Sequence, residues 1–243
     1  MPTTLTPAEL IREPPLVHAD GFGAPTTYQL ATRVLEYLAT VVQAGDATLE
    51  TGEGVSTILC AMLGARHTCV TPNGDAVGRI RAYCDSHHIS LDHVTFAMGL
   101  SEEVLPTLGD APLDLVVIDG SHSLPATFID WYYAGRRLRV GGLVVVDDVQ
   151  LWPCALLAEF LESEPMWREV FSEPGRTRVF ERTQPGELIR HWQLQPLVVA
   201  ETERRSHPMS RTLGTKAGNA WRLLRARRYS TILEKVRKNL QGR

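Results

Sequence analysis

The 243-residue sequence lacks long apolar runs, and it is poor in cysteine and in aromatic residues. No stretch approaches the roughly 20 consecutive apolar residues that cross a bilayer. The four cysteines form no CxxC pair, which disfavours a zinc site and a disulfide framework. The first residues also lack the basic-then-apolar pattern of a signal peptide. From these absences we expect a cytoplasmic protein with reduced thiols.

The formal net charge is only −3, but it is unevenly distributed. Residues 201–243 hold twelve Lys and Arg against three Glu, a net +9, which leaves −12 for the rest of the chain. Apolar residues recur at helical spacing beside these cations over residues 217–240, which predicts a basic amphipathic helix. We expect it to dock on the acidic body or a second subunit, with peripheral contact to an anionic membrane as the alternative. Nucleic acid is not expected, because the acidic body would repel phosphates.

The central part of the chain alternates short apolar runs with helical segments. Strands are predicted at residues 48–50, 67–71, 94–97, 115–118, 143–146, 168–171 and 177–181, and helices at 26–45, 56–63, 75–87, 101–108, 128–138 and 155–161. Residues 26–200 are therefore predicted to form a doubly wound, Rossmann-like α/β domain. Its seven-stranded sheet is mostly parallel and ends in a C-terminal β-hairpin. Residues 1–25 are predicted to be an N-terminal arm and residues 201–243 a basic helical tail.

Two of the predicted strands end abruptly in acid. Asp119 follows the fourth strand, and Asp147 and Asp148 follow the fifth. Ligands of open α/β sheets bind beyond the carboxyl ends of the strands, and neighbouring strands lie about 4.8 Å apart. The three carboxylates could therefore hold one Mg²⁺ or another divalent cation, with open positions for substrate oxygens. The alternative is that Asp148 caps the next segment and Asp119 only holds a cofactor loop.

A glycine turn, ETGEGVST, lies between the first strand and the following helix and contains Glu50, Gly52, Glu53, Gly54 and Ser56. Such a turn is typical of nucleotide sites, although two of the usual three glycines remain and a plain tight turn is the alternative. The Glu53 carboxylate would repel the pyrophosphate of NAD or FAD. S-adenosylmethionine has no phosphate and carries a sulfonium cation, so the turn favours it and disfavours a dehydrogenase.

This turn, the acid-terminated fourth strand and the final hairpin resemble class I S-adenosylmethionine-dependent methyltransferases. Residues 99–106, GLSEEVLP, resemble the segment after the third strand in the catechol O-methyltransferase group. Residues 118–122, IDGSH, are similar to bacterial small-molecule and sugar O-methyltransferases. The resemblance covers roughly residues 45–182. It implies that Ser101 contacts the adenine and that Asp119, Asp147 and Asp148 hold Mg²⁺.

Two positions depart from the catechol-type pattern. His122 stands where that group carries a basic lysine, and an imidazole can accept a hydroxyl proton near neutral pH. Its alternative role is to order the loop after the fourth strand. Class I enzymes usually place an acid after the second strand to bind the ribose hydroxyls, but Thr71 stands there. Asn73 or Asp75 could supply a further hydrogen bond.

Together these features predict an S-adenosylmethionine-dependent O-methyltransferase assisted by a divalent cation. Its acceptor would be a hydroxyl of a small molecule or a glycosyl group. A metal-independent methyltransferase is the alternative among enzymes. A non-catalytic Rossmann-like binding or scaffolding module is the alternative from another class.

Overall fold

The computed structural model describes residues 5–19, 22–187 and 190–206. The chain divides into two compact units, with the division between Leu197 and Val198. The basic helix predicted over residues 217–240 lies outside the described residues.

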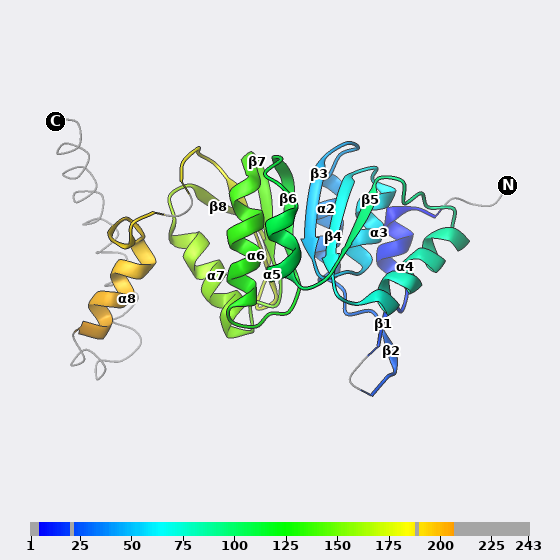
Figure 1. Ribbon diagram of the computed structural model, residues 1–243, viewed down its shortest axis with the longest axis horizontal. Helices are drawn as coiled ribbons and strands as arrows, with labels where there is room; N and C mark the ends of the chain where they lie inside the picture. The colour runs from blue at the N-terminus through cyan, green and yellow to red at the C-terminus, as the bar shows by residue number, and fades with distance from the viewer. Residues whose placement is uncertain (1–4, 20–21, 188–189, 207–243) are drawn as a thin grey trace. The chain divides into compact units, whose positions relative to one another are not determined.

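A seven-stranded sheet forms the centre of the first unit, in the order β5-β4-β3-β6-β7-β9-β8 (Figure 1). Its strands are β3 (Ala47–Thr51), β4 (Arg66–Thr71), β5 (Val94–Met98), β6 (Leu113–Ile118), β7 (Leu138–Val146), β8 (Trp167–Glu173) and β9 (Thr177–Arg182). The first five strands of that order are parallel, and β9 runs antiparallel to both β7 and β8. This architecture confirms the predicted doubly wound sheet with its terminal hairpin.

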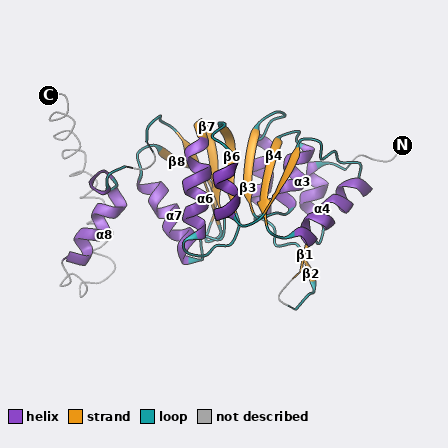
Figure 2. Cartoon of the chain, viewed as in Figure 1, coloured by secondary structure: helices purple, strands orange, loops and turns teal. Residues whose placement is uncertain are grey.

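Helices cover both faces of the sheet (Figure 2). One face carries α1 (Pro7–Arg12), α2 (Thr32–Val41), α3 (Val55–Met62) and α4 (Gly74–Ser86). The other face carries α5 (Ser101–Val104), α6 (Ala126–Ala134), α7 (Trp152–Ser163) and the 3-10 turns η1 (Leu105–Thr107) and η2 (Gly135–Arg137). Strand β6 shows why its sequence is a continuous apolar run. Leu115 and Val117 pack into the core on the first face, while Val116 and Ile118 pack into the core on the second, so each of these four positions needs an apolar side chain.

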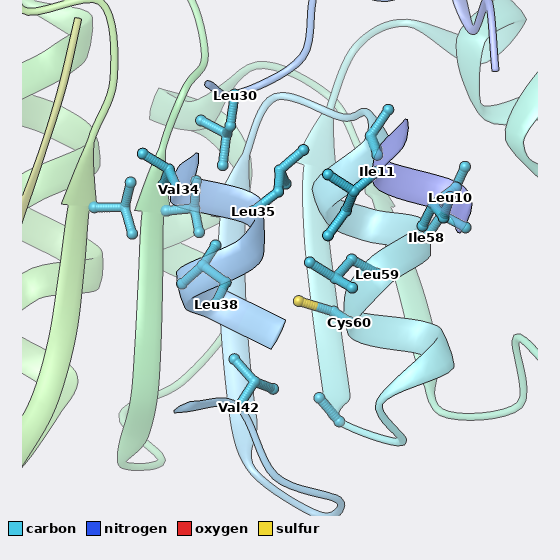
Figure 3. Packing of buried hydrophobic residues seen from close by; sticks show 14 of the residues in the cluster. Leu10, Ile11, Leu30, Val34, Leu35, Leu38, Val42, Ile58, Leu59 and Cys60 are labelled. Carbon is cyan, nitrogen blue, oxygen red and sulfur yellow. The ribbon is translucent and has the colours of Figure 1, made fainter. Parts of the chain in front are cut away.

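The N-terminal arm lies on the first of these cores. Helix α1 begins at a capping box in which the Thr6 and Glu9 side chains bond each other's backbone, and it buries Leu10 and Ile11. These two side chains lie beside those of α2 and α3 in Figure 3. The sequence predicted an arm on the body but no helix within it.

Helix α2 begins later than predicted. The expected start at residue 26 is occupied by a small two-stranded sheet, in which β1 (His18–Ala19) pairs with β2 (Pro25–Thr26). The backbone at Ala31 is still outside the helical region, with φ −53° and ψ 136°, so the helix starts at Thr32.

The 3-10 turn η3 (Trp192–Leu194) closes the described part of the first unit, and α8 (Pro196–Ser206) leads into the second. Over the described ranges, no helix combines the length and apolar character needed to cross a membrane.

Candidate active site

A cavity of about 800 Å³ opens at the carboxyl ends of β3, β4, β6 and β7. The strand order reverses between β3 and β6, and this switch point is where open α/β sheets bind their ligands. Of the predicted cofactor residues, those that line the cavity are Gly52, Glu53, Thr71, Ser101 and Asp119. The three predicted metal ligands and His122 line it as well.

The glycine turn connects β3 to α3, and Gly52 is required there by its neighbour on β6. Its φ is +90°, and a Cβ at this position would collide with the Asp119 carbonyl oxygen. The Gly52 amide donates to the Val70 carbonyl over 3.0 Å. The absence of a side chain at Gly52 therefore lets the turn approach the end of β6. The Gly52 amide is already hydrogen-bonded to β4.

Three predicted cofactor residues of the turn are buried and do not line the cavity: Glu50, Gly54 and Ser56. The Gly54 amide donates to the Thr57 hydroxyl over 3.1 Å, and that hydroxyl donates to the Glu50 carboxylate. Glu50 is only 1% exposed, and His67 Nε2 lies 3.1 Å from its Oε1. These residues support the turn from the interior.

Glu53 turns its carboxylate toward the end of β4. It accepts hydrogen bonds from the Thr71 hydroxyl over 2.5 Å and from Asn73 Nδ2 over 2.9 Å. His18 Nδ1 of the arm lies 3.5 Å from Glu53 Oε1. Burial raises the pKa of Glu53, and the two hydrogen bonds oppose that shift. The glycine turn thus supplies a carboxylate beside the place where the sequence has Thr71 instead of an acid.

Ser101 starts α5 on the opposite wall of the cavity. Behind it lies Asp130, which is 1% exposed and accepts a hydrogen bond from the Thr51 hydroxyl over 2.8 Å. Burial raises the pKa of Asp130, and hydrogen bonding from Ser101 and Thr51 opposes that shift. Asp130 therefore couples the end of β3 to the wall that carries Ser101.

Asp119, His122 and Asp148 form a compact group in which one ligand atom from each lies within 4.8 Å of the others. His122 Nε2 is 3.3 Å from Asp148 Oδ2 and 3.7 Å from Asp119 Oδ1. His122 and Asp148 both have φ of 52°, in the left-handed region that few non-glycine residues adopt. Such strain gathers at functional sites, and here it occurs at two members of one cluster.

The neighbouring Asp147 behaves differently. It is 2% exposed, and its carboxylate accepts a hydrogen bond from the Thr177 hydroxyl of β9. Burial raises the pKa of Asp119 well above its ordinary range, and the nearby Asp147 and Asp148 carboxylates add to the shift. The compact group therefore takes His122 as its third member in place of Asp147, and metal ligation by Asp147 stays a prediction.

These donors fit a divalent cation. Two carboxylate oxygens and an imidazole nitrogen suit Mn²⁺, and the carboxylate oxygens alone suit Mg²⁺. A cation would also relieve the repulsion from Asp147 and Asp148, which adds to the effect of burial on the pKa of Asp119.

Sequence reasoning missed several lining residues. His18 comes from the arm, Tyr28 from the segment between β2 and α2, and Arg176 from the turn between β8 and β9. Arg176 Nη2 donates to the Gln29 carbonyl over 2.6 Å, so the hairpin turn contacts the segment that precedes α2. No local pattern marks these residues, because their place depends on contacts between distant segments.

Comparison with known proteins identifies the domain that builds this cavity. Residues 49–149 match the family model of a methyltransferase domain. The chain therefore contains a methyltransferase domain. That match begins in β3 and ends just after Asp148, so it contains both the glycine turn and the acids. The resemblance drawn from the sequence is confirmed, and so is the prediction of an enzyme.

Solved structures show the same fold for this methyltransferase at low sequence identity. The O-methyltransferase TomG from Streptomyces achromogenes, in complex with SAM, is 18% identical with a TM-score of 0.57 over 72% of this chain and 90% of its own. Cofactor-bound Rv0187 from MTB is 20% identical with a TM-score of 0.54, covering 65% and 83%. The O-methyltransferase NovP is 17% identical with a TM-score of 0.54, covering 69% and 88%. No curated protein matches the chain.

Proposed function

We propose that this methyltransferase moves a methyl group from S-adenosylmethionine to a hydroxyl of a small-molecule or glycosyl acceptor, with help from a divalent cation. The observation that carries the proposal is the convergence of Asp119, His122 and Asp148 on the cavity that also contains Glu53. The solved O-methyltransferases TomG and NovP share the fold and lend support.

The glycine turn favours S-adenosylmethionine over dinucleotides. Glu53 presents a carboxylate to the cavity, and the amides of Gly52 and Gly54 are already bonded to protein acceptors. A pyrophosphate would therefore meet negative charge and find neither of these donors. A ribose diol is a better match, because its hydroxyls donate and Glu53 accepts. S-adenosylmethionine would supply a sulfonium-bound methyl group, the electrophile of the reaction.

The acceptor hydroxyl would be handled by the cluster on the other side of the cavity. Asp119, Asp147 and Asp148 would hold the cation, and a bound cation would supply the Lewis acidity that favours loss of a hydroxyl proton. His122 Nε2 would accept that proton, and the Asp148 carboxylate 3.3 Å away would stabilise the imidazolium. Two adjacent acceptor oxygens would best match this arrangement.

Transfer of a labelled methyl group tests the proposal. The purified chain is incubated with methyl-labelled S-adenosylmethionine and either catechol or phenol, in Mg²⁺, in Mn²⁺ and in excess chelator. We expect labelled product from the diol, much less from phenol, and none in chelator. Full activity in chelator would favour the metal-independent alternative. Absence of S-adenosylhomocysteine binding by calorimetry would contradict the cofactor assignment itself.

We also propose that the basic tail contacts an anionic membrane, a second subunit or the acidic body. The helix on which this proposal depends, residues 217–240, lies outside the described ranges.

A further inference from the structure

A buried histidine beneath the glycine turn has no place in the proposed chemistry. His67 lies in β4, is 2% exposed and does not line the cavity. Its Nδ1 is 2.8 Å from the Thr48 hydroxyl, and its Nε2 is 3.1 Å from Glu50 Oε1. Strand pairing brings these side chains together, because β3 and β4 are parallel neighbours.

Glu50 needs a counter-charge at this depth. A buried carboxylate without a cationic partner is strongly destabilising, and removing one member of such a pair leaves an uncompensated charge. Within the described residues, His67 is the basic side chain that pairs with Glu50. Burial alone disfavours the imidazolium, but the adjacent Cys60 and Glu50 outweigh burial and raise the pKa of His67 to about 10. The raised pKa favours the protonated imidazole beside the Glu50 carboxylate.

The charge on Glu50 is linked to the turn through one hydroxyl. The Thr57 O–H has a single proton, which it donates to the Glu50 carboxylate. Its oxygen is then free to accept the Gly54 amide at 3.1 Å. A displaced Glu50 would no longer hold that hydroxyl in this direction. Gly54 directly follows Glu53, so this chain of contacts ends at the backbone that carries the cavity carboxylate.

We propose that His67 is a positioning residue for the cofactor site, acting as the buried partner that holds the Glu50 carboxylate in place. Through Thr57, the pair fixes the Gly54 amide and so the direction in which Glu53 faces the cavity. The proposal rests on the proposed use of S-adenosylmethionine. It predicts that a side chain outside the cavity controls cofactor affinity.

Calorimetry with S-adenosylhomocysteine on the full chain tests the linkage. Loss of a hydrogen bond to a charged group typically weakens affinity about 10- to 100-fold. We expect affinity to weaken by this factor in His67→Gln and in Thr57→Val. Thr57→Val keeps the shape of the side chain but removes its hydroxyl. Thr57→Ser restores the hydroxyl and should bind as the wild type does. Thr48→Ser is the matched control, because it changes a neighbour of His67 but keeps the hydroxyl beside Nδ1 and leaves the ion pair.

Two readouts need no cofactor. Nitrogen NMR of the imidazole should show both ring nitrogens of His67 protonated at about pH 8 in the wild type and a neutral ring in Glu50→Gln. Amide hydrogen exchange at Gly54 should be at least about tenfold faster in Thr57→Val than in Thr57→Ser. These readouts decide the inference even if the wild type fails to bind S-adenosylhomocysteine, a result that would overturn only the proposed function.

Three results would overturn the inference. They are a neutral His67 in the wild type at that pH, equal Gly54 exchange in the two Thr57 variants, and cofactor affinity within threefold of wild type in both Thr57→Val and a folded His67→Gln. If His67→Gln does not fold, the comparison of the Thr57 variants decides alone.

Discussion

Two groups of acidic side chains lie at or beneath the same cavity, and they differ in what neutralises them. Under the glycine turn, Glu50 pairs with His67, and Glu53 is held by the donors of Thr71 and Asn73. At the ends of β6 and β7, Asp119 and Asp148 share a single imidazole, that of His122.

This difference indicates where a ligand charge is needed. The first group is satisfied by the protein itself, which suits a rigid support for a cofactor. The second group combines a raised Asp119 pKa with two left-handed residues, so its folded geometry stores repulsion and strain. A cation would relieve the repulsion, and the proposed metal chemistry therefore belongs to the ends of β6 and β7 and not to the glycine turn.

Asp119→Asn should have the largest effect. Metal assistance supplies several kcal/mol, so loss of a ligand should lower methyl transfer by about a thousandfold or more. Calorimetric titration with Mn²⁺ should show the matching loss of metal binding. Asp110→Asn, at a side chain that is 83% exposed, is the control and should change neither. Retained Mn²⁺ binding in Asp119→Asn would move the metal away from this cluster.

His122→Ala comes next. Loss of a general base should reduce turnover by about 10²–10⁴, with S-adenosylhomocysteine affinity unchanged because the side chain faces the acceptor. Mn²⁺ titration of the variant separates two roles. Unchanged metal affinity supports the base, whereas weakened affinity makes the imidazole a ligand. If turnover stays at the wild-type level, His122 only orders its loop.

Glu53→Gln should weaken S-adenosylhomocysteine binding about 10- to 100-fold, because a charged acceptor of hydrogen bonds is lost. Glu102→Gln is the matched control, since Glu102 is an exposed acid that lines the same cavity. The wild type should also prefer S-adenosylmethionine to NAD, and the substitution should narrow that preference. Tighter binding of NAD by the wild type would contradict this account of the turn.

The same carboxylate predicts a pH dependence of binding. Burial raises the pKa of Glu53, so the acceptor is lost by protonation at a higher pH than for an ordinary glutamate. Cofactor affinity should therefore fall as the pH is lowered toward that raised pKa. In Glu53→Gln this fall should be absent, and calorimetry across the pH range measures both.

A smaller effect concerns stability. His67 has a pKa near 10 when folded and about 6.5 when unfolded, so its stabilising contribution is complete below the lower value and disappears as pH rises through the higher one. One kcal/mol corresponds to about 2–4 °C of Tm in a domain of this size. The Tm difference between wild type and His67→Gln should be several degrees at neutral pH and should shrink near pH 10. A constant difference would assign the stabilisation to packing.

The smallest effect is expected from deleting residues 207–243. The sheet, the cavity and both acidic groups lie within the first compact unit, so Tm and S-adenosylhomocysteine affinity should stay unchanged. Binding to anionic vesicles or self-association should instead be lost, in a salt-sensitive manner. Vesicle sedimentation and light scattering measure these losses. Unfolding of the truncated chain would show that the tail belongs to the core.

Much of the fold could be predicted because the apolar character of a strand's residues indicates which of its faces are buried. The apolar runs at residues 115–118 and 143–146 are covered on both faces, and the structure confirms them as β6 and β7. The arm could not be read in this way. Helix α1 is only six residues long, and the places of His18 and Tyr28 depend on contacts with segments far along the chain.

The sequence by itself determined the sheet, its helices and which acids lie at its carboxyl edge, because apolar periodicity and strand ends are local properties. Only the tertiary structure decided where each carboxylate points. Asp147 and Asp148 are adjacent, yet one bonds Thr177 of β9 while the other, in a left-handed conformation, joins His122. The pairing of Glu50 with His67 was likewise invisible, since residues 17 positions apart meet only when β3 and β4 align. Partner choice for a buried charge depends on three-dimensional packing, which no local pattern of residues specifies.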